Sequence, residues 1–307
     1  MSILSKKYFH NEAAAFNHLE KLLWADGVVC PHCGSIDRAS KMNGRTTRVG
    51  LWKCYECRKQ FTVKVGTVFE SAHIPLSKML QAVYLMSASK KGVSAHQLHR
   101  TLEITYKSAW FLAHRIREAM RDGKLGPLGG EGKIVEADET FIGRKAGFAK
   151  ARAGAAHKMK VMSLVERGGS VRSIVMDNLS RAEVEYVIRT NVRRESKLMT
   201  DTASYYKGKG LGPKEHHMVN HFANEYVRGE AHVNTLEGYF SIFKRGMKGV
   251  YQHCAEKHLH RYLAEFDFRY NERVALGVND ETRAGKAMKG IVGKRLTYRT
   301  PGEQPAT

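Results

Sequence analysis

The chain has 307 residues, of which 42% are hydrophobic, so it can hold roughly two or three domains with real cores. It carries 51 Lys and Arg against 30 Asp and Glu, a formal charge of +21. Such an excess is typical of a protein that binds a nucleic-acid backbone. No run of 18 apolar residues supports a membrane partner, and residues 1–10 have no apolar signal core. We therefore expect a soluble protein that is cytoplasmic and associated with the nucleoid.

Four cysteines near the N-terminus form two Cys-x2-Cys pairs, Cys30 with Cys33 and Cys54 with Cys57, with 20 residues between them. This spacing predicts a tetrahedral Zn²⁺ site with four thiolate ligands, of the zinc-ribbon type. Disulfides are the weaker alternative, because the chain reads as intracellular. We assign residues 1–70 to an N-terminal helix and this ribbon. Cations surround the pairs, so the ribbon either contacts DNA or serves only as a structural staple.

Three short helices are predicted in residues 71–125. The second begins at Ser94, the third begins near Thr105, and the apolar positions of the third recur on one side. This spacing directs the basic residues outward; they are Lys107, Arg115 and Arg117. A basic third helix after a short turn resembles a helix-turn-helix whose last helix enters the major groove of DNA. A helical linker with solvated charges is the alternative.

A glycine-rich stretch at residues 123–132 marks a domain boundary. The segments that follow alternate between strand and helix patterns: strands at 134–137, 160–165 and 170–176, a helix at 181–191 and a strand at 197–200. This order predicts an α/β domain with a mixed sheet over residues 130–275, and it resembles the RNase H-like fold. The remaining residues, 276–307, read as a basic C-terminal tail that is loose from about Arg299.

Three acids occur in this domain in a suggestive order. Asp138 and Asp201 each close an apolar run, and Glu237 lies on a helical pattern with Asn234 and Lys244 on the same side. Divalent cations prefer carboxylate oxygens, and two such ions about 4 Å apart can hold both the attacking and the leaving oxygen of a phosphodiester. The pattern predicts a Mg²⁺ or Mn²⁺ site for phosphoryl transfer on nucleic acid.

Two further features flank this pattern. Strand alternation is expected to direct Glu136 and Glu139 to the face opposite Asp138. The segment 142–160 holds six Lys and Arg and no acid, so we expect a basic loop that grips phosphates beside the site. A solvated insertion is the alternative for this loop. The DNA-binding residues predicted in and near the catalytic domain are Arg144, Lys145 and Lys248.

The chain resembles the DDE transposases of bacterial insertion sequences, in the group with an N-terminal zinc ribbon and an Asp-Asp-Asn/Glu-Lys pattern. Its motifs cover nearly the whole chain: CPHC at 30–33, GVSAHQLHRTL at 92–102, AHRIREAM at 113–120, EADETFIG at 136–143, HVNTLEG at 232–238 and HLHRYLAEF at 258–266. The resemblance implies that Asp138 and Asp201 bind the catalytic metal and that Lys244 grips a phosphate. The third ligand is Glu237 or Asn234, of which Glu237 is preferred because a carboxylate neutralises a divalent ion better than an amide.

The resemblance also implies the reaction. The protein would bind the terminal repeats of its element as double-stranded DNA, cleave them and join the freed 3′-hydroxyl to target DNA, as at least a dimer that holds two ends. Its metals would be a structural Zn²⁺ and a catalytic Mg²⁺ or Mn²⁺. The alternatives from other classes are a zinc-ribbon and helix-turn-helix regulator that only binds DNA, and a nuclease of the same fold that does not join strands.

Overall fold

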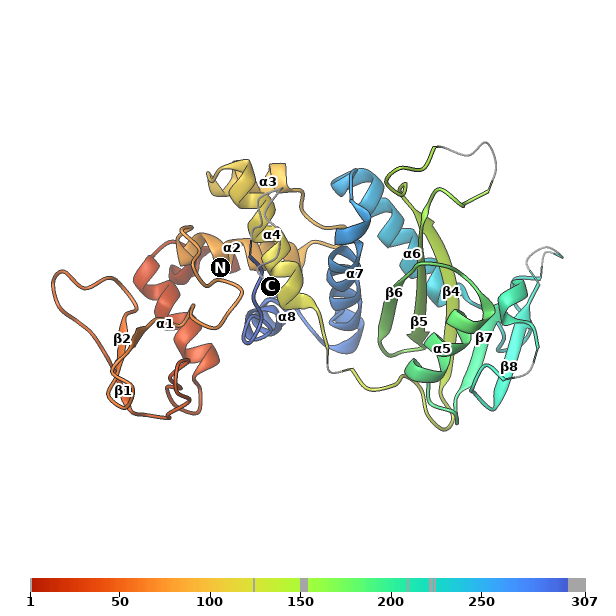
Figure 1. The fold of residues 1–307 in the computed structure, drawn as a ribbon, viewed down its shortest axis with the longest axis horizontal. Coiled ribbons are helices and arrows are strands. Elements are labelled where there is room, and N and C mark those ends of the chain that lie inside the picture. The colour runs from red at the N-terminus through yellow and green to blue at the C-terminus, as the bar shows by residue number, and fades with distance from the viewer. Residues whose placement is uncertain are drawn as a thin grey trace. The chain divides into compact units, whose positions relative to one another are not determined.

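The computed structural model of the chain describes residues 2–123, 125–149, 154–208, 210–220, 223 and 225–297 (Figure 1). The chain divides into two compact units: Met1–Arg121 together with Gly277–Thr307, and Asp122–Leu276. Among the described residues, no helix is long and apolar enough to cross a bilayer. The end of the predicted tail, including the segment from Arg299, lies outside the described residues.

The first unit begins with a helix and a small antiparallel sheet. Helix α1 (Glu12–Leu23) starts where the side chain of Asn11 accepts a hydrogen bond from the backbone N–H of Ala14, one of the N–H groups that a helix start leaves unpaired. Short 3₁₀ helices precede it at Ile3–Ser5 and Lys7–Phe9. The strands of the sheet, in spatial order, are β1 (Ala39–Lys41), β2 (Trp52–Cys54) and β3 (Gln60–Phe61).

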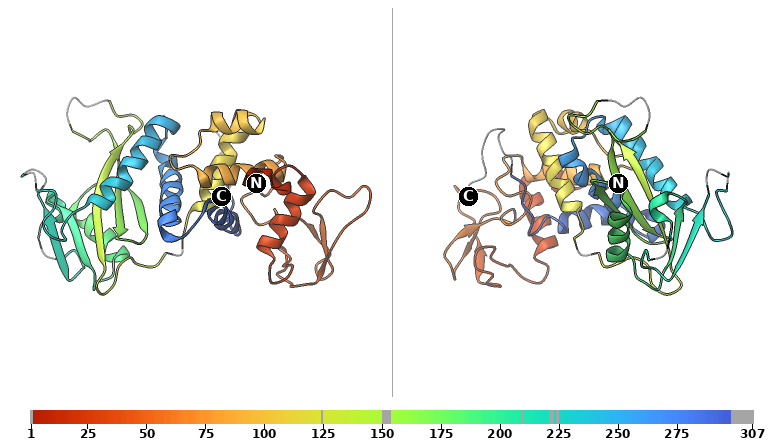
Figure 2. Two further views of the ribbon diagram at one scale, coloured as in Figure 1. Left: turned by 180° about the vertical axis from the view of Figure 1, so that it is seen from behind. Right: turned by 45° about the vertical axis from the view of Figure 1, so that its right-hand side comes forward.

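Four helices complete the first unit: α2 (Leu76–Ala88), α3 (Ala95–Leu102), α4 (Tyr106–Met120) and α8 (Asp280–Lys289). The predicted helix starts are confirmed, because the side chains of Ser94 and Thr105 accept the N-terminal hydrogen bonds of α3 and α4. Helix α8 comes from the segment that reads as a tail, and it packs against α2 and α4 (Figure 2).

Helix α4 is more enclosed than its sequence pattern predicts. Arg115 and Arg117 are only 8% and 2% exposed, so the prediction that both face outward is wrong. The C-terminal segment lies against this helix: a Cβ on Gly290 would meet the carbonyl oxygen of Ala119 at 2.3 Å, and Lys294 donates to the same carbonyl at 3.1 Å. A helix covered by such a distant part of the chain has no solvent face for these arginines.

The second unit is built on a five-stranded mixed sheet in the order β6-β5-β4-β7-β8. The first three strands are antiparallel to their neighbours, and β4, β7 and β8 run parallel. The strands are β4 (Ile134–Ile142), β5 (Met159–Glu166), β6 (Val171–Met176), β7 (Lys197–Asp201) and β8 (Glu215–Val219). The predicted α/β fold with a mixed sheet, of the RNase H-like type, is confirmed.

Helices cover both faces of this sheet (Figure 1). Helices α6 (Asn234–Gly246) and α7 (Glu256–Asn271) share a core with alternate residues of the antiparallel strands, such as Ile142 and Val161. Helix α5 (Arg181–Asn191) shares a second core with the intervening residues, such as Ala137 and Met162. The described part of this unit also contains the 3₁₀ helices Ser204–Tyr206 and Val274–Leu276 and the π-helical turn η5 (Met247–Tyr251).

Candidate active site and zinc centre

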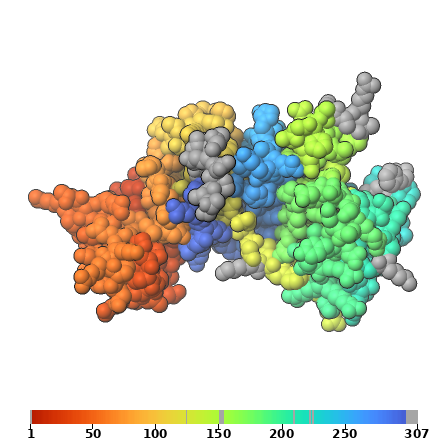
Figure 3. All heavy atoms as spheres, in the orientation of Figure 1, coloured from red at the N-terminus to blue at the C-terminus, as the bar shows by residue number. Residues whose placement is uncertain are grey.

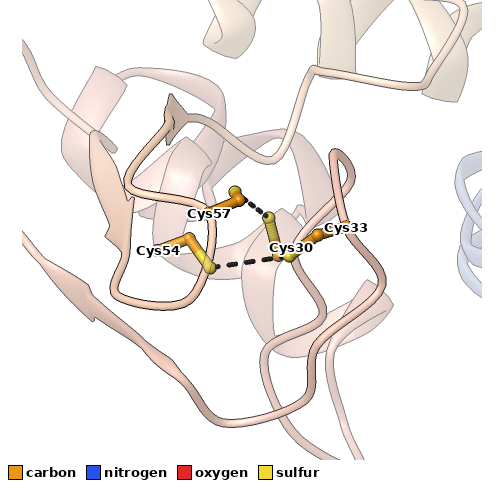
Figure 4. Close-up of side chains that lie close together, drawn as sticks. All are labelled: Cys30, Cys33, Cys54 and Cys57. Atoms are coloured by element: carbon orange, nitrogen blue, oxygen red, sulfur yellow. Dashed lines mark hydrogen bonds between the residues drawn. The ribbon is translucent and has the colours of Figure 1, made fainter.

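The four cysteines of the two Cys-x2-Cys pairs gather at one point of the ribbon (Figure 4). The Sγ atoms of Cys30 and Cys57 lie 3.7 Å apart, and those of Cys33 and Cys54 are also 3.7 Å apart. A tetrahedral zinc ion with Zn–S bonds of about 2.3 Å places its sulfur ligands about 3.8 Å from one another. The four thiols are therefore spaced as a zinc ion requires.

The turn after the first pair brings polar groups to these sulfurs. Gly34, in the left-handed region with φ of 75°, donates its N–H to the carbonyl of Cys30 at 2.9 Å. The hydroxyl of Ser35 then lies 3.2 Å from the sulfur of Cys33 and 3.3 Å from that of Cys54. The hydrogen bond with Ser35 is the main reason that the pKa of the Cys54 thiol falls to about 6. The contact with Ser35 favours the thiolate of Cys54, which is the form that binds zinc.

The sheet brings the first two predicted acids together. Strands β4 and β7 are parallel neighbours with Glu136 opposite Met199, so Asp138 and Asp201 lie two residues further along at the same level. Both follow the alternation of Ile142 and Met199, which places them on the face that α6 covers. Asp138 does not close its strand as its sequence suggests, because β4 continues to Ile142.

The charges around Asp138 come from both the sheet and the helix. The pKa of Asp138 is raised to about 7, mainly by burial and in part by the carboxylates of Asp201 and Glu237, while the backbone N–H of Glu139 and the charge of Lys244 oppose the rise. Glu237 and Lys244 of α6 are thus close enough to act on this carboxylate. Enclosed acids that repel one another form a site where a divalent cation would be favourable.

Helix α6 separates a polar face from an apolar one, as predicted. The buried residues pack into the core with α7 and the sheet; they are Leu236, Phe240, Phe243 and Met247. The predicted functional residues are all exposed or half-buried: Asn234 begins the helix, Glu237 is in its first turn, Lys244 is in its last turn, and Lys248 follows in η5. The candidates for the third ligand therefore both lie at the N-terminal end of α6.

Glu139 is a third acid at this point, although the strand pattern does not predict it as a ligand. One ligand oxygen from each of Asp138, Glu139 and Asp201 lies within 4.8 Å of the others. As predicted from alternation, Glu139 projects from the other face, where it accepts hydrogen bonds from the hydroxyls of Tyr205 and Tyr206. Burial and the charges of Asp138 and Asp201 raise the pKa of Glu139 to about 8. The signal in the sequence is an acid directly after Asp138 and a Tyr pair just after Asp201.

The same alternation argument is wrong for Glu136. Residues 136 and 138 are two apart on a strand, so they share a face, and Glu136 bonds to the first turn of α6. Glu136 is fully buried.

The cations predicted to bind DNA differ in their surroundings. Lys107, Arg144 and Lys248 are exposed. Lys145 instead forms an ion pair with Glu256 of α7 at 3.2 Å, and its side chain is only 15% exposed. The loop after β4 thus lies against the start of α7 (Figure 3). The middle of the predicted basic loop, residues 150–153, lies outside the described residues.

The sequence of the chain is similar to two protein families and to a protein of a transposable element. Residues 127–271 match the ISXO2-like transposase domain family, and residues 10–60 match the transposase zinc-ribbon domain family. The chain is 27% identical over 282 residues to an uncharacterized protein in transposable element ISH50 of Halobacterium salinarum, a match that covers 86% of this chain and 92% of that protein. The expected resemblance is confirmed.

Two solved structures have some similarity to the chain. One is a pre-cleavage Mos1 transpososome, with 12% identity, a TM-score of 0.29, and coverage of 69% of this chain and 74% of that chain. The other is the Mos1 strand transfer complex, with 14% identity, a TM-score of 0.28, and coverage of 69% and 73%.

Proposed function

We propose that this chain, which joins the zinc ribbon of transposases to the ISXO2-like transposase domain, is a DDE-type DNA transposase that cleaves the ends of its element and joins them to target DNA. The observation that carries the proposal is the convergence of Asp138 and Asp201 on adjacent parallel strands, under a helix that adds Glu237 and Lys244. The substrate would be double-stranded DNA in the cytoplasm, and two ends would be held by at least a dimer.

The residues present fit the catalytic ions that this function requires. Asp138 and Asp201 would hold Mg²⁺ or Mn²⁺, with Glu237 or Asn234 as the third protein ligand and Glu139 beside them. When bound, the ions lower the pKa of a water and neutralise charge on the phosphate oxygens. Burial and the charges of Asp201 and Glu237 raise the pKa of Asp138, and a bound cation would offset both effects.

The other residues act on the DNA. Lys244 lies two helical turns after Glu237, so it would hold a phosphate oxygen while Asp138 and Asp201 keep the reacting phosphodiester in line. Water would attack the phosphorus and release the 3′-hydroxyl of the element. That hydroxyl would then attack a phosphodiester of the target and expel its 3′-oxygen, so no covalent bond to the protein forms. Lys107, Arg144 and Lys248 would contact the DNA backbone.

Labelled element ends and a target plasmid, with Mg²⁺ or Mn²⁺, test this proposal. We expect cleavage and joining by the unmodified protein, and neither by Asp138→Asn, which should still bind DNA. The matched control is Asp177→Asn, because Asp177 is an exposed aspartate of the same unit that follows β6; it should keep full activity.

Each alternative function gives a different result in this assay. Cleavage without joining would replace the transposase by a nuclease, and binding without cleavage would replace it by a DNA-binding regulator. Retained cleavage by Asp138→Asn would reject the assignment of this site.

A further inference from the structure

The N-terminus of α6 is capped by a side chain from the sheet and not by its own sequence. Val233 occupies the N-cap position, and no side-chain hydrogen bond from it caps the helix. Glu136 of β4 takes that role: one carboxylate oxygen accepts the backbone N–H of Leu236 at 3.0 Å, and the other accepts the hydroxyl of Thr235 at 2.8 Å. A carboxylate there satisfies an unpaired N–H and opposes the positive end of the helix dipole.

A single arginine completes this arrangement. Arg167, in the turn between β5 and β6, donates from Nε to the Glu136 carboxylate at 2.6 Å. Its two terminal nitrogens donate to the carbonyls of Glu230 and His232 at 2.8 and 2.9 Å. The guanidinium thus binds both the acid and the segment that leads into α6. We call Glu136 and Arg167 together the α6 clasp.

The clasp connects the elements that carry the proposed catalytic residues. Glu136 lies two residues before Asp138 on the same face of β4. The two residues that it binds, Thr235 and Leu236, stand between Asn234 and Glu237, the candidates for the third metal ligand. One buried carboxylate therefore joins the strand of the first acid to the helical turn of the third.

We propose that Glu136, with Arg167, is a positioning residue that sets the distance between Asp138 and the third metal ligand; this inference rests on the proposed function. Both carboxylate oxygens of Glu136 accept hydrogen bonds, one from Arg167 and Thr235 and the other from Leu236, and the side chain is fully buried. A glutamine would not replace it, since its NH₂ group would face a donor from α6 or from Arg167. The buried charge of Glu136 is paired with the guanidinium of Arg167, and Nδ1 of His232 lies 3.4 Å from the same carboxylate oxygen.

The test compares two buried glutamates of the second unit that each pair with an arginine. Glu136→Gln should lower kcat for end cleavage by about 10- to 100-fold, as the loss of groups that orient metal ligands does. Its Kd for DNA should not change, and in the absence of DNA its Kd for Mn²⁺, measured by calorimetry, should rise. The control is Glu265→Gln, because Glu265 pairs with Arg269 on α7, far along the chain from the acids. That variant should lose stability but keep both kcat and Mn²⁺ affinity.

A milder variant keeps the test decisive where Glu136→Gln does not fold. Thr235→Val removes one hydrogen bond to Glu136 without changing side-chain shape, and it should lower kcat and Mn²⁺ affinity in the same direction. The clasp alone would be overturned if the wild-type protein cleaves DNA and if Glu136→Gln and Thr235→Val have the same kcat and the same Kd for Mn²⁺ as Glu265→Gln. A wild-type protein that neither cleaves DNA nor binds Mn²⁺ would overturn the proposed function and the clasp with it.

Discussion

A second polar contact holds the middle of α6, and it leads to a pH-dependent prediction. The carboxylate of Asp267 on α7 accepts hydrogen bonds from the backbone N–H and the hydroxyl of Ser173 on β6, at 2.8 and 2.7 Å, and from the hydroxyl of Tyr239 on α6, at 2.5 Å. Burial raises the pKa of Asp267 from 3.8 to about 6 despite these donors. Asn fits in its place, because its oxygen can accept the N–H while its NH₂ donates to the two hydroxyls.

The raised pKa of Asp267 determines whether the folding stability rises or falls with pH. The native state holds this proton more tightly than the unfolded chain, so the stability that it contributes is complete below pH 4 and is lost as the pH rises through about 6. A shift of about two pKa units corresponds to about 3 kcal/mol. Asp267→Asn carries no charge, so it should be more stable than the wild type by up to about 3 kcal/mol at pH 8 and by only about 1 kcal/mol at pH 4.5.

The assay must report on the second unit. All three tryptophans of the chain belong to the first unit, so their fluorescence does not follow Asp267. Hydrogen exchange of peptides from α6 and α7 over a urea series gives the local free energy of unfolding at each pH. Asp177→Asn, at an exposed site, should match the wild type at both pH values. Equal or lower stability of Asp267→Asn at pH 8 would mean that the three hydrogen bonds outweigh the cost of the buried charge.

Four further predictions concern other parts of the chain. Cys54→Ser should abolish stoichiometric zinc, measured by emission spectroscopy, and open the ribbon to protease; full zinc retention would contradict the four-thiolate site. Lys244→Ala should lower end cleavage in a gel assay, with partial recovery in Lys244→Arg, and an unchanged rate would exclude a phosphate contact. Gly285→Ala should stabilise α8 by about 0.5 kcal/mol, because its new Cβ meets nothing within 4 Å. Gly290→Ala should destabilise the first unit by about 1 to 3 kcal/mol through its clash with Ala119, and tryptophan fluorescence during urea unfolding should distinguish the two glycine variants.

Local patterns were sufficient to predict most elements of the fold. The strands predicted at 160–165 and 170–176 form the antiparallel neighbours β5 and β6, and α5 occupies the predicted residues 181–191. Strand β8 (Glu215–Val219) was missed, because its sequence is polar and its place at the sheet edge leaves several residues partly exposed. The packing of α8 was missed because its partner helices are far away in the sequence.

At the candidate site too, features set by the neighbouring sequence were predictable, and features set by contacts between distant segments were not. The sequence pattern placed Asp138 and Asp201 on separate strands, and the parallel pairing of β4 with β7 brings the two to one level. It did not include Glu139, which lies beside both acids. Whether each Lys or Arg side chain is exposed or paired was not predictable, because this depends on contacts with another element. Lys145 pairs with Glu256, and Arg115 is covered after the C-terminal segment returns.

The two anchors of α6 explain how a helix packed mainly by apolar contacts keeps a single register. Its buried residues, such as Phe240 and Phe243, supply most of the stabilisation, but apolar contacts have little directionality and define the orientation of the helix less sharply than hydrogen bonds do. The bonds of Glu136 to the first turn and of Asp267 to Tyr239 do not survive a shift, because each carboxylate would be left buried with fewer donors. Since a shift of one residue rotates the helix by about 100°, it would also turn Glu237 away from Asp138. The polar anchors therefore specify the orientation on which the proposed chemistry depends.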